Sequence, residues 1–287
     1  MAKRRVLLIV RHPVGGIRTF LRYVYMNIGS ENYEYTIIAP EMPETRVLLD
    51  DLKELDLTYI PVNYSASDME FLKCVSESIW ANSFDLIHSH GFTSGLCASL
   101  AAFARSVPHI LTCHDVFTVG QFSGARGVVS KLVLNVAFLM VDRIHCVSKD
   151  ARSNFLATLP VLKMFKRRQV LAIMNGIAVE AFTTTTRRDL RKELGLLPNT
   201  FLIGFMGRFM APKGFRYLVD ALELLKQKRG LDKAPVVLAF GQRDGYIREE
   251  QESIKKRGLA DSVLFLPFVP NVASTLNGLG VVARPSL

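Results

Sequence analysis

A short segment in the second half of the chain carries residues suited to binding phosphate. Gly207-Arg208-Phe209-Met210-Ala211-Pro212-Lys213-Gly214 follows the apolar run Phe201–Met206 and precedes a helical pattern. A helix N-terminus offers free N–H groups, Arg208 adds a forked, permanently charged donor, and Lys213 adds a mobile point charge. Two cations at the carboxyl end of a parallel strand suit a diphosphate. An ordinary strand–helix turn with solvated charges is the equal alternative on sequence shape alone.

Paired glycines follow the first apolar run of the chain. Pro13-Val14-Gly15-Gly16 comes directly after Arg5–Val10, and Gly15 and Gly16 allow the backbone to approach a ligand closely. The segment lacks the Gly-x-Gly-x-x-Gly fingerprint, and a glycine pair between a strand and a helix is more often only a turn. Asn175-Gly176, at the end of a later run, is also interpreted as a turn when taken alone.

Three histidines stand at the ends of two successive apolar runs. His88 and His90 end one run (DLIHSHG), and His114 with Asp115 ends the next (LTCHD). We expect the three rings to converge at one sheet edge, where imidazoles could bind a metal. No carboxylate or cysteine at ligand spacing accompanies them, so a role in a substrate cleft is favoured. A structural role for any single ring is about as plausible.

Apolar runs alternate with helix-length segments from the N-terminus onward. Most runs are continuous, which is typical of parallel strands covered on both faces, and the alternation predicts two Rossmann-like, doubly wound α/β domains. The first set of strands is expected at Arg5–Val10, Tyr35–Ala39, Thr58–Val62, Asp85–Ser89, His109–Cys113, Arg143–Val147 and Val170–Met174. The helices between them are expected at Ile17–Ile28, Arg46–Leu55, Met69–Ala81, Thr93–Arg105, Val128–Val141 and Asp150–Leu156.

The pattern restarts after a polar stretch, Thr183–Arg188, which is expected to connect the two domains. The second set of strands is expected at Phe201–Met206, Val236–Phe240, Val263–Leu266 and Gly280–Ala283. Its helices are expected at Arg216–Lys228 and Tyr246–Arg257. No helix is expected to follow the last strand, so this second domain is smaller than the first.

The composition indicates a globular chain of 287 residues with a net charge of +10. A basic surface suits a polyanionic partner, although solubility alone would also explain it. The four cysteines lie far apart in the sequence, as suits a reducing cytoplasm. Gly127–Val141 is too short for a membrane span of about 20 residues. Because its apolar residues surround the helix, it is interpreted as core-facing, with contact to anionic lipid through it and the basic Lys163–Arg168 as the alternative.

Taken together and in order, these segments resemble family 4 retaining glycosyltransferases. The similar stretches, spread from Val6 to Leu287, are PVGGIRTF, FDLIHSHGF, ILTCHD, DRIHCVSKDA, IMNGI, GRFMAPKGF and VVARPSL. The resemblance implies a GT-B fold of two domains. Residues 1–178 would form the acceptor-side domain, and residues 179–287 would form the domain that binds the nucleotide sugar.

The resemblance also implies roles for particular residues. Arg208 and Lys213 would clamp the donor diphosphate and His114 would lie against the transferred sugar, so these three are the expected catalytic residues. The expected donor-binding residues are Gly15, Gly16, Ser148, Asn175, Gly207, Arg208, Lys213 and Gly214. The family works without a metal, and the chain has no Asp-x-Asp to hold a divalent ion. No cofactor is expected beyond the nucleotide-sugar substrate.

We therefore expect an enzyme that moves a sugar, with retention, from a nucleotide sugar to a cell-surface polysaccharide or glycolipid acceptor. It would act in the cytoplasm, with peripheral contact at the inner membrane face and no nucleic-acid partner. The family's two glutamates, seven residues apart, follow the counterpart of Pro285-Ser286 and are not reached before Leu287, so the second domain is expected to be incomplete. Two alternatives are a non-catalytic truncated remnant that binds acceptor or membrane, and a nucleotide-sugar epimerase of the same fold.

Overall fold

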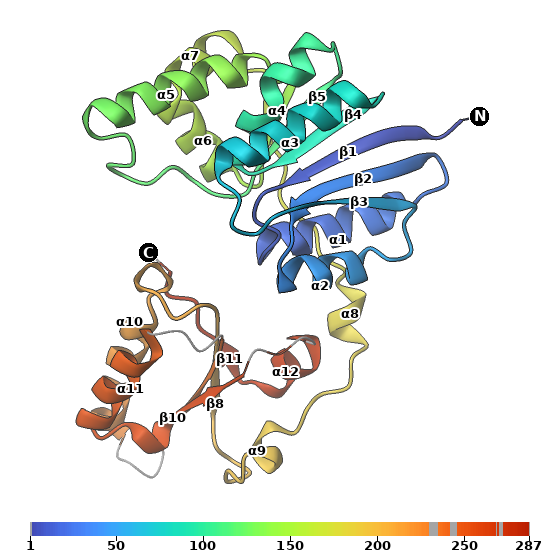
Figure 1. Ribbon diagram of the computed structural model, residues 1–287. Coiled ribbons are helices and arrows are strands. Elements are labelled where there is room, and N and C mark those ends of the chain that lie inside the picture. Colours follow the sequence, from blue (N-terminus) through green and yellow to red (C-terminus); the bar gives the residue numbers. More distant parts are fainter. Residues whose placement is uncertain (1, 230–234, 242–245, 268, 270–271, 287) are drawn as a thin grey trace. The chain divides into compact units, whose positions relative to one another are not determined.

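The computed structural model of the chain separates into two compact units, Met1–Ile177 and Ala178–Leu287 (Figure 1). It describes residues 2–229, 235–241, 246–267, 269 and 272–286. Each unit contains one parallel β-sheet with helices between its strands. The two-domain Rossmann-like fold expected from the sequence is therefore confirmed.

The first unit is built on a seven-stranded parallel sheet with the order β3-β2-β1-β4-β5-β6-β7. Its strands are β1 Arg4–Val10, β2 Tyr33–Pro40, β3 Leu57–Val62, β4 Leu86–His90, β5 His109–Cys113, β6 Arg143–Cys146 and β7 Val170–Ala172. Its helices are α1 Gly16–Ile28, α2 Pro43–Asp51, α3 Asp68–Ala81, α4 Phe92–Ala104, α5 Gly124–Leu139, α6 Lys149–Thr158 and α7 Pro160–Phe165. All seven expected strands are present, within a few residues of their predicted bounds.

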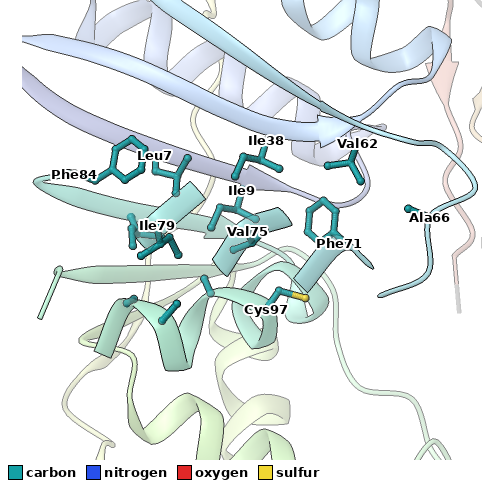
Figure 2. Packing of buried hydrophobic residues seen from close by; sticks show 14 residues of the cluster. Leu7, Ile9, Ile38, Val62, Ala66, Phe71, Val75, Ile79, Phe84 and Cys97 are labelled. Carbon is teal, nitrogen blue, oxygen red and sulfur yellow. The ribbon is translucent and has the colours of Figure 1, made fainter. Parts of the chain in front are cut away.

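Helices cover both faces of this sheet, which explains the continuous apolar runs. Side chains that alternate along β1 pack in opposite directions, with Leu8 against α1 and α2 and Leu7 and Ile9 against α3 and α4 (Figure 2). Helix α3 begins at a capping box in which Ser67 and Glu70 bond reciprocally, an arrangement that satisfies two free backbone N–H groups. A second core between β5, β6 and helices α5 to α7 continues the layer of α3 and α4.

The second unit has a four-stranded parallel sheet with the order β10-β9-β8-β11. Its strands are β8 Leu202–Met206, β9 Val236–Phe240, β10 Val263–Leu266 and β11 Val281–Val282. Its helices are α8 Glu180–Thr183, α9 Leu190–Glu193, α10 Phe215–Arg229, α11 Tyr246–Lys256 and α12 Val272–Gly278. All four expected strands are present, whereas α7, α8, α9 and α12 were not predicted because short helices show little apolar periodicity.

The polar stretch Thr183–Arg188 is part of the second unit rather than a free connection. Asn277 in α12 donates hydrogen bonds to the carbonyls of Phe182 and Thr185, at 2.9 and 3.2 Å. The Arg188 guanidinium donates to the Thr275 hydroxyl at 3.1 Å. The units instead divide between Ile177 and Ala178, ahead of the stretch that the sequence suggested.

Helix α5 faces the core with one side only, so the core-facing interpretation of Gly127–Val141 holds for that side, where Phe138 and Val141 are buried. The helix buries Gly127, Asn135 and Phe138. Five of its apolar side chains remain 46–64% exposed: Val128, Val129, Leu132, Val133 and Val136. Since apolar residues occur all around this helix, periodicity could not show which face packs. No helix in the described part of the chain is long and apolar enough to cross a membrane.

Candidate functional sites at the strand ends

Each sheet reverses its strand order at one place, where neighbouring strands lead into helices on opposite sides. In the first unit this switch lies between β1 and β4, and in the second it lies between β8 and β11. Open parallel sheets bind ligands beyond the carboxyl ends of the strands at such switch points. The loop with Gly15 and Gly16 follows β1, and the loop with Arg208 and Lys213 follows β8. Two segments predicted from residue type therefore lie at the two switch points.

The loop after β8 is held in place by its aromatic residues. Phe209 is 1% exposed, and its ring contacts those of Phe205, Phe215 and Phe265 at centroid distances of 5.2–5.7 Å. Burying Phe209 fixes the position of Arg208 immediately before it. Lys213 closes a short 3-10 turn that leads into α10.

Gly214 joins this loop to the segment after β11. Its φ of +68° is a left-handed conformation, and a Cβ atom there would lie 1.9 Å from the Pro285 carbonyl oxygen. Because a side chain would meet backbone, only glycine fits without a shift. Gly207 donates its N–H to the Phe240 carbonyl at 3.1 Å. The expected donor-binding glycines thus shape the strand-end loops and bring Arg284-Pro285 beside them.

Arg208 is exposed and Lys213 is half-buried. Neither forms an ion pair with a carboxylate of the described residues. Arg284, which follows the neighbouring strand β11, is also exposed. A set of cations without neutralising carboxylates can bind an anion without first breaking internal pairs, so this switch point is suited to a diphosphate.

The loop after β1 offers backbone rather than charge. Gly15 has φ +54° and ψ −123° and caps α1, a conformation that favours glycine. Apart from the neighbouring residues and the backbone of the helix itself, no atom of the described residues lies within 4 Å of the position a Cβ would take at Gly15 or Gly16. The start of α1 is therefore open for close approach of a ligand.

Four histidines gather on the face of the first sheet that α1 covers. The Phe20 ring of α1 lies 5.1–6.4 Å from the rings of His88, His90, His114 and His145. The convergence of the first three was expected, whereas His145 was missed. Its motif, DRIHCVS, ends the next apolar run, so applying the same strand-end argument to β6 would have found it. The described residues include no group of three or more His, Cys, Asp or Glu able to hold a metal ion.

A row of hydrogen bonds joins two of these rings across the sheet. His145 Nε2 donates to the Ile173 carbonyl at 2.8 Å, since a carbonyl only accepts. The Thr112 hydroxyl lies 3.2 Å from His145 Nδ1 and 2.7 Å from His88 Nε2, and so bridges the two rings. The Tyr25 hydroxyl is hydrogen-bonded to His88 Nδ1. Both ring nitrogens of His88 are therefore hydrogen-bonded within the protein, which favours a structural role for this residue over a role in a substrate cleft.

His90 and His114 form a second pair. His90 Nδ1 lies 3.2 Å from His114 Nε2, while the buried His90 Nε2 has no partner among the described residues. Burial, and then the neighbouring His145, lowers the pKa of His114 to about 4. Burial also lowers the pKa of His88 to about 3. These rings are therefore neutral near pH 7, and the half-buried His114 can offer a neutral hydrogen-bonding group.

Ser148 and Asn175 lie after β6 and β7. The Ser148 hydroxyl accepts the Ala151 N–H at 2.9 Å and so caps α6, which is a structural use of this side chain. Asn175 is exposed in the segment after β7. The structure gives Asn175 no contact that distinguishes a ligand-binding residue from a turn residue.

Solved structures share this arrangement of two parallel sheets. The chain matches the structure of Anabaena Alr3699/HepE in complex with UDP with a TM-score of 0.78, over 98% of this chain and 74% of that one. At 18% sequence identity this likeness shows the fold alone, which is the GT-B fold that defines one structural class of glycosyltransferases.

The sequence places the chain within that class. The profile of Glycosyltransferase Family 4 matches residues 14–181, and the profile of Glycosyl transferases group 1 matches residues 186–287. The chain belongs to Glycosyltransferase Family 4. The resemblance inferred from the short motifs is thereby confirmed.

Two curated relatives illustrate the similarity. A D-inositol 3-phosphate glycosyltransferase of Jonesia denitrificans is 28% identical over 71% of this chain and 50% of its own length. A UDP-Gal:alpha-D-GlcNAc-diphosphoundecaprenol alpha-1,3-galactosyltransferase of Escherichia coli is 23% identical over 91% of this chain and 67% of its own length. The chain spans about half the length of the first of these relatives.

Proposed function

We propose that this chain belongs to an enzyme that transfers a sugar, with retention, from a nucleotide-diphosphate-sugar donor to a cell-surface polysaccharide or glycolipid acceptor. The main support is the pair of cations, Arg208 and Lys213, at the switch point of the second sheet, which form no ion pair with a carboxylate of the described residues. Departure of a nucleoside diphosphate builds negative charge on phosphate oxygens. Cations that are already in position stabilise that charge as it develops.

In this proposal the two units have different tasks. Ala178–Leu287 binds the nucleotide diphosphate through Arg208, Lys213 and the glycines that shape their loop. Met1–Ile177 serves the acceptor, with backbone N–H groups near Gly15 and Gly16 and His114 against the transferred sugar. A neutral His114 suits this task because it can hydrogen-bond a sugar hydroxyl without adding charge.

The acceptor class and location are also part of the proposal. One relative is named as acting on a diphosphoundecaprenol-linked sugar, which supports a lipid-linked acceptor here. Four free cysteines, three of them buried, suit a reducing compartment. We therefore place the protein in the cytoplasm, in peripheral contact with the inner face of the membrane.

Calorimetry with UDP tests the donor site. We expect Lys213→Ala to weaken UDP binding by about 1.5–3 kcal/mol, the range for a charge-assisted hydrogen bond, and Arg208→Ala to act similarly. Lys228→Ala, at the far end of α10, is the matched control and should bind like the parent. Unchanged affinity in both Lys213→Ala and Arg208→Ala would remove the donor assignment.

Transfer itself is tested by incubating labelled nucleotide sugars with lipid-linked acceptors. The proposal expects a product whose new linkage keeps the anomeric configuration of the donor, measured by NMR. Isomerisation of the donor sugar without an acceptor would instead identify an epimerase. A product of inverted configuration would contradict the retaining reaction.

A further inference from the structure

The solvent-facing side of α5 is apolar along almost its whole length. Its large exposed apolar side chains occupy positions i, i+1, i+4, i+5 and i+8, which a helix places on one face, and Arg126 and Ser130 of the same helix are also exposed. They are Val128, Val129, Leu132, Val133 and Val136. Surface helices normally turn polar residues to water, and contiguous apolar patches on soluble proteins commonly mark interaction sites.

Helix α7 packs against α5, and hydrogen bonds join it to α5 and to Val141 just beyond the end of α5. The Asn135 side chain of α5 accepts the Val161 N–H at 3.2 Å, and Lys166 donates to the Val141 carbonyl at 3.0 Å. Figure 1 shows the two helices side by side. The last residues of α7, Met164 and Phe165, are 74% and 66% exposed. We call the five exposed residues of α5 together with Met164 and Phe165 the α5–α7 face.

The segment of the chain that contains α5 and α7 is rich in basic residues. Residues 116–179 contain only two acidic residues, Asp142 and Asp150. The nine basic residues in the same range are Arg126, Lys131, Arg143, Lys149, Arg152, Lys163, Lys166, Arg167 and Arg168. None of the nine forms an ion pair within the described part of the chain, so this charge is available to a partner.

A basic cavity begins where α7 ends. It has a volume of about 690 Å³ and is lined by Lys149, Arg152, Ser153, Arg167, Arg168 and the edge strand β7. The Arg152 guanidinium donates to the carbonyls of Val170 and Arg167, at 2.7 and 3.2 Å. Arg152 is therefore held in place, and the cations around the cavity can receive a phosphate group.

We propose that the α5–α7 face docks onto an anionic phospholipid bilayer, with the basic cavity receiving lipid phosphate. An apolar helix face accompanied by basic residues is the pattern of a helix that lies in a membrane interface. A second copy of the chain fits less well, because pairing two such faces would bring like charges together. This inference deepens the proposed function, since a lipid-linked acceptor lies in the membrane, and it assigns the contact to particular residues.

Co-sedimentation with lipid vesicles tests the docking without any sugar donor. We expect the protein to pellet with vesicles containing phosphatidylglycerol at low salt, and to bind pure phosphatidylcholine much less. Val129→Gln with Val133→Gln should lower the partition coefficient about tenfold or more. Arg167→Gln with Arg168→Gln should lower it about 25-fold, at about fivefold for each cation near the surface.

Matched controls separate the surface from general effects of charge and hydropathy. Lys255→Gln with Lys256→Gln removes two exposed cations from α11, and Val47→Gln removes a 44% exposed valine from α2. Both control proteins should bind vesicles like the parent. Because all substituted side chains are exposed, circular dichroism should show that every variant is folded.

A tryptophan probe shows which surface enters the lipid. Trp80, the only tryptophan, is replaced by Phe, and Leu132→Trp is added on α5. We expect brominated phosphatidylcholine, mixed with phosphatidylglycerol, to quench this probe, whereas Val47→Trp on α2 should not be quenched.

Four results would overturn the docking proposal. The first three are no vesicle binding at low salt, equal loss of binding in the α5 and α2 variants, and a dimer in light scattering that the α5 substitutions dissociate. Inorganic phosphate that competes fully with vesicles would likewise identify a site for free anions instead of a membrane surface. None of these measurements uses the nucleotide site, so their failure is distinct from failure of the proposed transferase.

Discussion

Cations near the first strand of each unit meet different surroundings. In the N-terminal unit, Arg11 bonds to Asp68 at 3.2 Å and to the Ala66 carbonyl at 2.6 Å, and Arg18 bonds to Asp51 at 2.8 Å. In the second unit, Arg208 and Lys213 have no such carboxylate within the described residues. Charge near a strand end therefore indicates a ligand site only where the fold has not already neutralised it.

The two units also differ in their histidines, because all six lie in the N-terminal unit. Several of them are buried and bonded to one another or to neighbouring hydroxyls. The N-terminal unit therefore uses these polar groups mainly to join its own elements. In the second unit Arg188 and Arg257 are paired with carboxylates, whereas Arg208 and Lys213 have no carboxylate partner among the described residues.

A fall in pH should produce the largest difference in stability between the two units. Burial lowers the pKa of His88 to about 3 and that of His109 to about 4, both below the unfolded value of about 6.5. The contribution of these neutral rings to folding stability is fully present above about pH 6.5. It is lost as the pH falls toward the pKa values that the rings have in the folded protein. At pH 5 each ring should cost the N-terminal unit about 2 kcal/mol.

The measurement is urea unfolding at pH 7 and pH 5 with one tryptophan in each unit. Trp80 lies on α3 and reports the N-terminal unit, while Tyr217→Trp on α10, combined with Trp80→Phe, reports the second. Only the first signal should move strongly between the two pH values. Equal shifts in both signals would show that the histidines do not set this difference.

The next largest effect concerns the aromatic anchor of the β8 loop. Phe209→Ala removes a fully buried ring and should cost the second unit about 3 kcal/mol, the lower end of the usual range because a surface loop can relax. Phe201→Ala, at a 51% exposed position, is the control and should cost less. The unfolding transition reported by Trp80 should not change. A loss of stability of similar size in that transition would mean that the two units unfold together.

Gly15→Ala should have a moderate effect on the N-terminal unit. A side chain at φ +54° and ψ −123° is strained by about 1–3 kcal/mol. Gly16→Ala is the matched control, because Gly16 has no positive φ and open space around its Cβ position. Thermal unfolding followed by Trp80 fluorescence distinguishes them, and equal stability of the two variants would contradict the strain.

The smallest expected effect is at Arg284. This exposed residue follows β11, beside the β8 loop, and Arg284→Gln should weaken UDP binding by about 1 kcal/mol. Calorimetry measures this loss, and Arg248→Gln on α11 is the control. A loss as large as that expected for Lys213→Ala would mean that the diphosphate lies nearer to β11 than we propose.

Much of the fold could be predicted because local patterns determine it. Continuous apolar runs located the eleven strands of the described residues, since strands covered on both faces favour apolar residues at every position. The gathering of His88, His90 and His114 followed from their positions at the ends of neighbouring parallel strands. The β8 loop was found from residue type, because Arg208 and Lys213 stand between a buried run and a helix.

Other features depend on contacts between distant segments. Whether Arg11 or Arg208 is paired depends on Asp68 and on other parts of the fold that no local pattern reveals. The exposed face of α5 could not be predicted either, since valines occur all around that helix and only its neighbours determine which ones are buried. Phe20 and Tyr25 were missed as partners of the histidines for the same reason.

The row from Tyr25 through His88, Thr112 and His145 to the Ile173 carbonyl has a consequence for how substitutions combine. The Thr112 hydroxyl bridges the two imidazoles of this row, so Thr112→Val would leave two imidazole nitrogens unsatisfied at once. In the Thr112→Val protein the row is already interrupted. A substitution at Tyr25 would therefore change the stability of that variant by a different amount than it changes the stability of the parent protein. Substitutions along this row are therefore expected to be non-additive, so sequence changes in these strands should be tolerated in combinations more readily than singly.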